Sequence, residues 1–345
     1  MKKVLLPLLQ YGFFLGLGIF LVWWSLHEIP DSEWSKFKTS LQSARYWLII
    51  PVFFLLTTSH ILRTLRWKLL MEPMGYRPSF LNSFFAVMIG YLANLAVPRL
   101  GEVLKCTLLS RYEKVPVERV LGTIVAERAF DVISLLAVFL LALLLQFDVV
   151  TGSYANITGM QGNTDKTGGW GGWIVLIAIV IMGTWLAWVF YTGRGKALVQ
   201  KIAGLLRGVW EGLISAGKIK QKKLFFFYTV AIWVLYIGGT WMGFYATAGT
   251  DQLGFQVAVS GLAFASIGMI ITPGGIGAYA FLLALVVEQN GVEYAMGVAN
   301  GTLQWFAQVL IVVLVGGICL LALPIYNKKR QHENSRSHPA ENNIA

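Results

Sequence analysis

The sequence predicts an all-α polytopic membrane protein with about six full transmembrane helices and two broken, re-entrant hairpins. The chain has 345 residues, is 56% hydrophobic and has a mean hydropathy of +0.64, which is unusual for a soluble domain. Apolar runs of span length recur along it, since about 20 apolar helical residues cross a hydrocarbon core of about 30 Å. The formal charge of +11 gathers in short stretches between these runs, which indicates membrane topology and argues against a nucleic-acid partner.

The chain contains uninterrupted apolar runs and apolar runs that are broken in the middle. The first run lacks a small-residue cleavage site behind it, so we expect a membrane span there and no cleavable signal peptide. Two further runs, 80–110 and 255–289, are broken in the middle, at residues 98–101 and 273–275. The six uninterrupted runs cover about 5–25, 46–62, 120–147, 172–191, 224–248 and 297–323.

Lysine and arginine set the expected orientation. The segment 192–223 is rich in both and has Glu211 as its only acid, so we expect it in the cytoplasm. Basic residues at both ends of the chain predict cytoplasmic N- and C-termini. The segments 148–171 and 286–296 are poor in basic residues and are expected outside. We therefore predict a multi-pass protein of the cell (inner) membrane.

With this orientation, each broken run enters and leaves the membrane on the same side. The run 80–110 has basic residues on both flanks and is expected to enter from the cytoplasm, and the run 255–289 from outside. One membrane domain, 1–326, then divides into halves of about 1–150 and 170–326 with opposite orientation, the inverted-repeat plan of many transporters. The polar tail 327–345 is expected to be disordered.

The first broken run contains the stretch NLAVPRLGEVLKC, which places Arg99, Glu102 and Lys105 among apolar residues. A helix that begins after the break leaves free backbone N–H groups inside the membrane, and these attract anions, the more so beside Arg99. The structural alternative is an ion pair that closes the hairpin. Because charges inside a membrane are costly, the functional interpretation is favoured.

The stretch AERAFD carries Glu127, Arg128 and Asp131 inside the run 120–147. Glu127 and Asp131 are four residues apart and share a helix face, and Arg128 can reach Asp131. These three charges either neutralise one another, so that the helix can insert into the membrane, or the two acids pair with Arg99 or Lys105 of the hairpin. Such an interhelical pair could open when an anionic head group arrives.

Three further segments are candidates. Pro273 with Gly274, Gly275 and Gly277 forms either an anion-binding nest of backbone N–H groups or a tight turn. Arg63, Arg66 and Lys68 are either basic residues that snorkel at a span end or a phosphate landing site. The segment 196–214 reads as an amphipathic anchor on an anionic leaflet surface. The cysteines and histidines show no metal-site spacing, so we expect no metal and no cofactor.

The motifs together resemble the transmembrane, flippase-like region of lysylphosphatidylglycerol synthases and their stand-alone relatives. The matching residues, in order, are RxxRW at 63–67, Asn94 with PRLGEVLK at 98–105, ERAFD at 127–131 and PGGIG at 273–277. The resemblance spans about 45–325. It implies a membrane domain with re-entrant helices around a polar cavity. Such a domain is expected to move anionic phospholipids or polyprenyl-linked lipids between leaflets. Ala280 departs from the family, which often has Glu at that position. No aminoacyl-transferase domain follows, so synthesis of lysylphosphatidylglycerol is not expected.

We therefore expect a lipid flippase or transporter, not an enzyme. One alternative is a membrane-embedded lipid-modifying transferase, which a bound divalent metal would reveal. Another is a non-catalytic partner subunit, which pull-downs with and without the tail would reveal. The oligomeric state, a homo-oligomer included, stays open. The expected head-group site consists of Arg63, Arg66, Asn94, Arg99, Glu102, Lys105, Glu127, Arg128, Asp131, Pro273, Gly274, Gly275 and Gly277.

Overall fold

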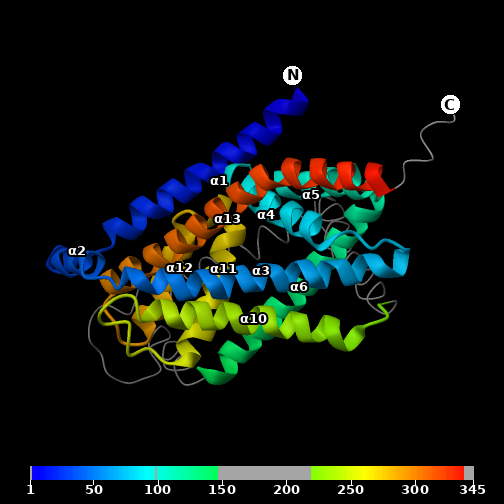
Figure 1. The fold of residues 1–345 in the computed structure, drawn as a ribbon. Coiled ribbons are helices and arrows are strands. Elements are labelled where there is room, and N and C mark those ends of the chain that lie inside the picture. The colour runs from blue at the N-terminus through cyan, green and yellow to red at the C-terminus, as the bar shows by residue number, and fades with distance from the viewer. Residues whose placement is uncertain (1, 98, 147–218, 338–345) are drawn as a thin grey trace, which may run out of the picture.

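A computed structural model describes residues 2–97, 99–146 and 219–337. These residues form ten α-helices and, within those ranges, no strand. Figure 1 shows an elongated bundle in which most helices run along the long axis. The predicted fold class, an all-α polytopic membrane protein, is confirmed.

Four described helices are long and apolar enough to cross a membrane. Two of them, α3 and α10, pack antiparallel. At one end of the pair the backbone N–H of Arg45 donates to the Ala246 carbonyl at 2.8 Å, and at the other Gln221 donates to Glu72 at 3.5 Å. The four helices are α3 (Ile49–Met71), α6 (Val117–Leu145), α10 (Lys222–Phe244) and α13 (Tyr294–Ser337).

The chain begins with α1 (Lys2–His27), which is followed by the short helix α2 (Trp34–Gln42). The two are bent by 85° at the break between them, and as one bent pair they count as a fifth candidate span. Trp34 and Phe37 of α2 pack against a buried cluster that includes Tyr294. The sequence analysis did not predict α2.

The first hairpin consists of α4 (Phe80–Ala96) and α5 (Leu100–Glu113). Ser79, the N-cap of α4, donates its backbone N–H and its hydroxyl to the Glu113 carboxylate, at 3.1 and 2.7 Å. The hairpin therefore starts and ends at the same end of the bundle, as predicted for a re-entrant hairpin. At 14 residues, α5 is about 21 Å long, shorter than a bilayer core of about 30 Å.

The second hairpin consists of α11 (Phe255–Ile271) and α12 (Ala278–Gln289), joined through a 3₁₀ turn at Pro273–Gly275. A Cβ on Gly249, just before α11, would overlap Sδ of Met296, which follows α12, so this hairpin also starts and ends at one end of the bundle. Met296 lies near the start of α13, whereas Arg330, which pairs with Glu113 of the first hairpin, lies near its end, so the two hairpins start from opposite ends. Both breaks lie where the sequence predicted them.

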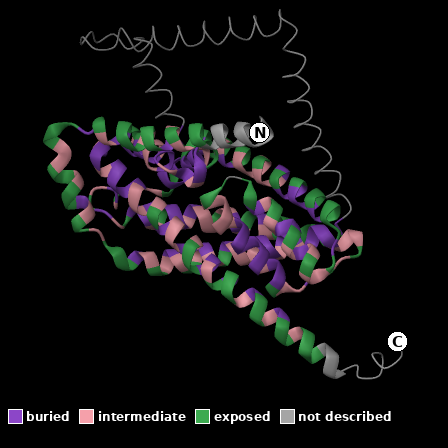
Figure 2. Cartoon of the chain, turned by 90° about the horizontal axis from the view of Figure 1, so that it is seen from above, coloured by how far each residue is buried: buried purple, intermediate pink, exposed green. Residues whose placement is uncertain are grey.

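The tips of the two hairpins meet inside the bundle. A Cβ on Gly274 would lie only 3.1 Å from Cδ2 of Leu95 in α4, so the second tip touches the first arm. The backbone of Gly277 lies against Gly18 and Val22 of α1, which covers the second tip. Figure 2 shows buried residues concentrated between the helices and exposed residues along the outer faces.

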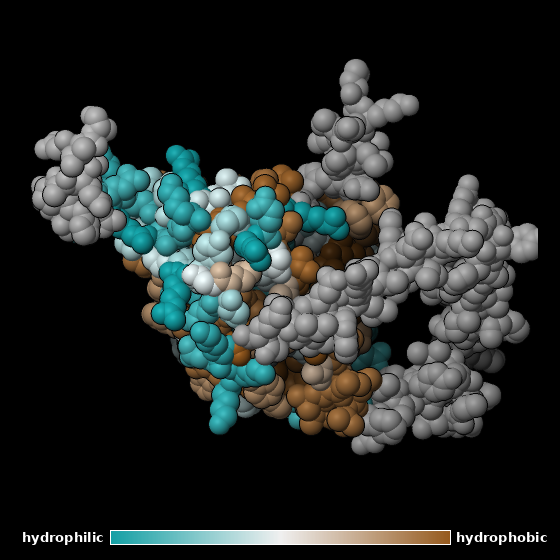
Figure 3. Space-filling model, turned by 90° about the vertical axis from the view of Figure 1, so that its right-hand side faces the viewer, coloured by the Kyte–Doolittle hydropathy of each residue, from teal (hydrophilic) through white to brown (hydrophobic). Residues whose placement is uncertain are grey.

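The two ends of the bundle carry opposite charge. The basic end holds the exposed Arg77, Arg111, Lys114, Arg119, Lys222, Lys223, Lys328 and Lys329, together with Arg330. At the acidic end, six acids outnumber the three basic residues Lys36, Lys38 and Arg45: Glu28, Asp31, Glu33, Asp251, Glu288 and Glu293. Figure 3 looks at the basic end, where hydrophilic side chains gather beside brown apolar flanks.

Two boundaries differ from the predictions. The span predicted over 46–62 continues as α3 to Met71, because its arginines are paired inside the bundle. The segment after Asn327 was predicted to be disordered, and this is wrong as far as Ser337, where α13 is still helical. The predicted span 172–191 and the predicted amphipathic segment 196–214 lie outside the described residues.

Candidate functional site

Five charged side chains from three helices meet inside the bundle, and we call them the ion cluster: Arg63 and Arg66 of α3, Lys105 of α5, and Glu127 and Asp131 of α6. Arg63 bridges Glu127 at 3.2 Å and Asp131 at 2.5 Å. Arg66 pairs with Asp131 at 2.6 Å, and Lys105 with Glu127 at 2.8 Å. The side chain of Asp131 is 17% exposed and the other four are 7% exposed or less.

Helical spacing explains how the cluster forms. Arg63 and Arg66 are three residues apart on α3, and Glu127 and Asp131 are four apart on α6, so each pair projects from one face. Lys105 reaches the cluster alongside Gly90 of α4, where a Cβ would lie 2.9 Å from Cγ of the lysine. A larger residue at position 90 would occupy the space that the lysine stem now takes.

Aromatic and hydroxyl side chains enclose the cluster. The Lys105 ammonium lies 4.4 Å from the ring centre of Trp67, a cation–π contact. The Trp67 indole N–H donates to Thr123 of α6 at 3.0 Å, which fixes the ring. From α10, the Tyr236 hydroxyl accepts from Arg63 at 3.4 Å. In the sequence, Trp67 is visible only as part of a motif and no signal marks Tyr236, because its position opposite α3 depends on tertiary packing.

The ion cluster has more positive than negative charge. Three cations face two carboxylates, which leaves one formal positive charge in excess. The Nε atoms of Arg63 and Arg66 are buried and have no hydrogen-bond partner among the described residues. A buried donor without a partner costs about 1–3 kcal/mol. Chemically, the cluster can therefore take up one anionic group.

A second ion pair, between α5 and α6, lies beside the ion cluster. Arg128 of α6 donates to Glu102 of α5 at 2.9 Å. Their side chains are 46% and 25% exposed, far more than those of the cluster. This corrects one prediction: Arg128 pairs with Glu102 and not with Asp131.

Arg99 and Asn94 lie at the tip of the first hairpin, outside the cluster. Arg99 is exposed, has a left-handed φ of 68° and forms no ion pair within the part of the chain that the structure describes. The Asn94 side chain accepts the Gly101 N–H at 2.7 Å, so one of the amides expected to attract an anion is already bonded. The prediction that Glu127 or Asp131 neutralises Arg99 or Lys105 is confirmed for Lys105 and wrong for Arg99. Pro98 lies outside the described residues.

The PGGIG motif forms the tip of the second hairpin. The Gly275 N–H donates to the Thr272 carbonyl at 3.0 Å, and the indole of Trp305 donates to the Gly274 carbonyl at 2.7 Å. Pro273, Gly275 and Gly277 are buried, and the last packs against α1. This geometry favours the tight-turn interpretation over an open nest.

The interpretation of Arg63 and Arg66 as a phosphate landing site assumed that they lie at the end of a membrane span. Both are instead buried in the middle of the bundle, where they supply most of the positive charge of the ion cluster. One helical turn earlier, the His60 ring lies 5.0 Å from that of Tyr91, and its Nδ1 has no partner among the described residues. Within the described ranges, no three His, Cys, Asp or Glu side chains form a group that could hold a metal ion.

Comparison with known proteins places the chain in a family. A model of the lysylphosphatidylglycerol synthase TM region matches residues 10–317. A UPF0104 membrane protein of Pyrococcus horikoshii is 22% identical over 93% of this chain and 97% of its own length. A UPF0104 membrane protein of Methanocaldococcus jannaschii is 30% identical over 30% of this chain and 31% of its own. No solved structure matches the chain. The chain therefore belongs to the membrane protein family of the lysylphosphatidylglycerol synthase TM region.

Proposed function

We propose that the protein is a lipid transporter of the flippase type, in which the ion cluster binds the head group of an anionic lipid. The lipid is a phospholipid or a polyprenyl-linked lipid. The observation that supports the proposal is the excess cation of the cluster: three buried cations face two carboxylates. Family membership supports a membrane lipid as the partner.

An unbalanced buried cluster needs a reason. Ionisable groups inside a membrane are costly and usually mark a substrate path or a partner. Ion pairs that served insertion alone would be balanced, since an uncompensated buried charge is strongly destabilising. One phosphodiester carries one negative charge, which would make the cluster neutral. Arginine also suits phosphate, because its planar N–H groups bond two oxygens at once.

Entry of the head group requires a movement at the border of the cluster. The Arg128–Glu102 pair is the part-exposed border, and it joins α5 to α6. Separating α5 from α6 opens the way to Lys105 and Glu127, which lie on the same two helices. Because α5 belongs to a short hairpin, it can shift without moving a full span. The acyl or prenyl chains stay in the bilayer while the head group moves.

The test is lipid movement in proteoliposomes that carry fluorescently labelled phosphatidylglycerol, with labelled phosphatidylcholine, a zwitterion of zero net charge, as the control. Arg66→Gln is the informative variant, since it leaves two cations facing two carboxylates. Arg119→Gln removes one exposed cation and is the matched control. Charge-assisted hydrogen bonds contribute about 1.5–3 kcal/mol, so Arg66→Gln should slow movement of the anionic lipid by about 10-fold or more.

The native protein should move phosphatidylglycerol, or a sugar-linked polyprenyl phosphodiester in a parallel arm, faster than protein-free vesicles do. If folded Arg66→Gln protein moves the anionic lipid at the native rate, the ion cluster is not the head-group site. If neither anionic lipid moves in any arm, with or without a membrane potential, transport is the part of the proposal that fails.

A further inference from the structure

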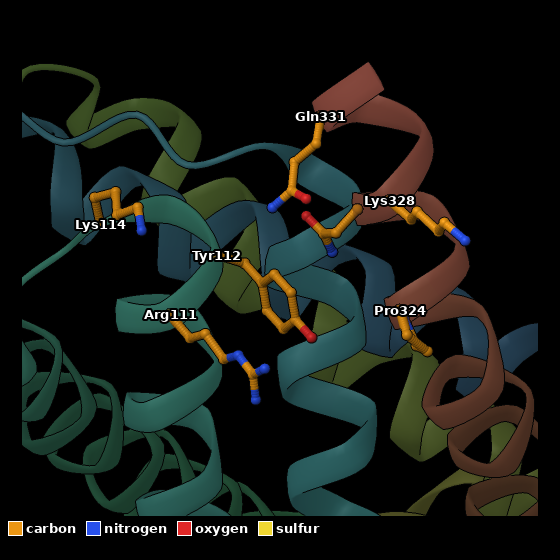
Figure 4. Close-up of a pocket in the computed structure, with 7 residues that line it drawn as sticks. Arg111, Tyr112, Lys114, Pro324, Lys328 and Gln331 are labelled. Carbon is orange, nitrogen blue, oxygen red and sulfur yellow. The ribbon is translucent and has the colours of Figure 1, made fainter. Parts of the chain in front are cut away.

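The basic end has a recess of about 340 Å³ between the last turn of α5 and the C-terminal part of α13. Arg111, Tyr112 and Lys114 line it from the α5 side, and Asn327, Lys328 and Gln331 from α13. We call it the basic recess. Figure 4 shows Tyr112 between the two helices with Arg111 beside it, Lys114 to one side on α5, and Lys328 on α13 extending away from Tyr112. Its volume lies at the lower end of the range of about 300–1,000 Å³ for small-ligand pockets.

The lining of the basic recess is positive and has no acid. Its three cations come from both walls, and the other lining groups are a phenol, two amides and a proline. The adjacent Glu113 is not part of the lining. Its carboxylate is bonded to Ser79 and Asn82 and paired with Arg330 at 2.5 Å. The three cations of the recess therefore meet no neutralising carboxylate in its lining.

The walls of the recess are held in place by hydrogen bonds. The amides of Asn327 and Asn82 bond each other in both directions, at 2.8 and 2.9 Å, which fixes α13 to α4. The Glu113–Arg330 pair ties α5 to α13 one turn further on. The guanidinium of Arg111 lies 5.5 Å from the ring centre of Tyr112. The recess is thus formed before any ligand arrives, which lowers the entropic cost of binding.

Lys114 adds an independent observation. It ends α5 with a left-handed φ of 58°, where glycine or asparagine is the usual residue. A non-glycine residue there costs about 1–3 kcal/mol. Position 114 thus holds a lysine where this backbone conformation favours glycine, and that lysine lines the recess.

We propose that the basic recess binds a phosphomonoester or pyrophosphate group. Three cations match a multiply charged phosphate better than a phosphodiester with one charge, and the Tyr112 phenol can donate to one of the remaining oxygens. The site is separate from the ion cluster, because Arg111 follows Lys105 by six residues, about 9 Å along α5. The group belongs either to a lipid or to a free phosphate compound, and the proposal does not depend on the proposed function.

The test measures binding to the purified full-length protein by calorimetry. Inorganic pyrophosphate tests a free phosphate, and short-chain phosphatidic acid tests a lipid-linked phosphomonoester. The recess variant combines Arg111→Gln, Lys114→Gly and Lys328→Gln, where glycine suits the left-handed position. The control combines Arg119→Gln, Lys222→Gln and Lys223→Gln, which removes the same charges from the same end.

The recess variant should weaken binding of pyrophosphate, phosphatidic acid or both at least 10-fold, and the control less than 2-fold. Binding of the lipid alone identifies a lipid-linked group, and binding of pyrophosphate alone a free one. Arg66→Gln should bind as the native protein does, so failure of the ion cluster and failure of the recess can be told apart. Equal losses in the recess variant and the control, or no binding of either ligand, would overturn the proposal.

Discussion

Glu127 is the residue on which the ion cluster most depends, because it pairs with cations from two helices. Its carboxylate joins Arg63 of α3 to Lys105 of α5, and its side chain is 2% exposed. Removing one partner of a buried ion pair leaves an uncompensated charge. The stability of the bundle should therefore respond strongly to this single position.

Glu127→Gln should destabilise the protein by about 3–5 kcal/mol, the usual cost of breaking a buried pair. The measurement is reversible unfolding in mixed micelles, followed by circular dichroism. Glu118→Gln, an exposed acid in the first turn of the same helix, is the control and should change stability by less than about 0.5 kcal/mol. Equal stability of Glu127→Gln and the native protein would mean that the buried cations need no counter-charge.

Arg66→Gln should cost less than Glu127→Gln, although Arg66 is more deeply buried. The substitution leaves two cations facing two carboxylates, and Arg63 still pairs with Asp131. The same unfolding assay compares the two variants directly. If Arg66→Gln is the more destabilising change, the excess positive charge does not determine how strongly the cluster responds to a substitution.

At the scale of elements, glycines set the distance between the two arms of each hairpin. A Cβ on Gly268 of α11 would lie 2.7 Å from the backbone of Ala278 and Tyr279 in α12, where a side chain cannot move aside. Gly122 of α6, by contrast, has nothing within 4 Å. The hairpin arms can therefore cross closely only where glycine stands.

Gly268→Ala should destabilise the protein by about 1–3 kcal/mol, the usual cost of forcing extra atoms into a packed contact. Gly122→Ala should be neutral or stabilising by up to about 1 kcal/mol, because alanine favours a helix and meets no neighbour there. Thermal unfolding of the two variants in the same detergent gives the comparison. Similar effects of both would show that the arms can separate slightly at no cost.

The contact of α4, α5 and α13 at the basic end should weaken in acid. Partial burial raises the pKa of Glu113, but hydrogen bonds from Ser79 and Asn82 and the pairing with Arg330 outweigh it, so the pKa lies below the ordinary 4.5. A carboxyl group with a lowered pKa stabilises the fold above its unfolded value, and this contribution is lost as the pH falls through the folded value.

The melting temperature of the native protein should therefore fall between pH 6 and pH 3, and Glu113→Gln should make that fall smaller. Glu118→Gln is the control, since Glu118 is exposed and takes part in none of these contacts. Identical pH profiles for native and Glu113→Gln protein would assign the acid sensitivity to other groups.

How far the sequence predicts these elements depends on how local the signal is. The breaks at Pro273 and near Arg99 are local, since each has proline and glycine close together, a combination that disfavours a continuous helix, and both were predicted. The partners of Arg63 and Arg66 are not local. A charged stretch at the end of an apolar run looks like a span end, and only the crossing of α3 and α6 shows that Asp131 lies opposite.

At the scale of the whole molecule, opposite charge at the two ends gives the bundle a direction. The end of α3, the start of α10 and the C-terminal part of α13 lie together at the basic end. The acids lie at the other end, where α2 meets the start of α13. Because basic residues stay on the cytoplasmic side, we expect the basic end and its recess to face the cytoplasm. A recess there would meet phosphate groups on that side before they reach the ion cluster.

Cysteine labelling tests this orientation and the two hairpins together. In a variant with the buried Cys106 and Cys319 replaced by alanine, single cysteines go to Arg77 and Arg119, which flank the first hairpin, or to Gln252 and Glu288, which flank the second. An impermeant maleimide should label Gln252→Cys and Glu288→Cys on intact cells, and Arg77→Cys and Arg119→Cys only in inverted vesicles. Labelling of Arg77→Cys and Arg119→Cys from different sides would show that α4 and α5 together cross the membrane. The ion cluster would then lie on a continuous span, and the movement of α5 that admits the head group would no longer be available.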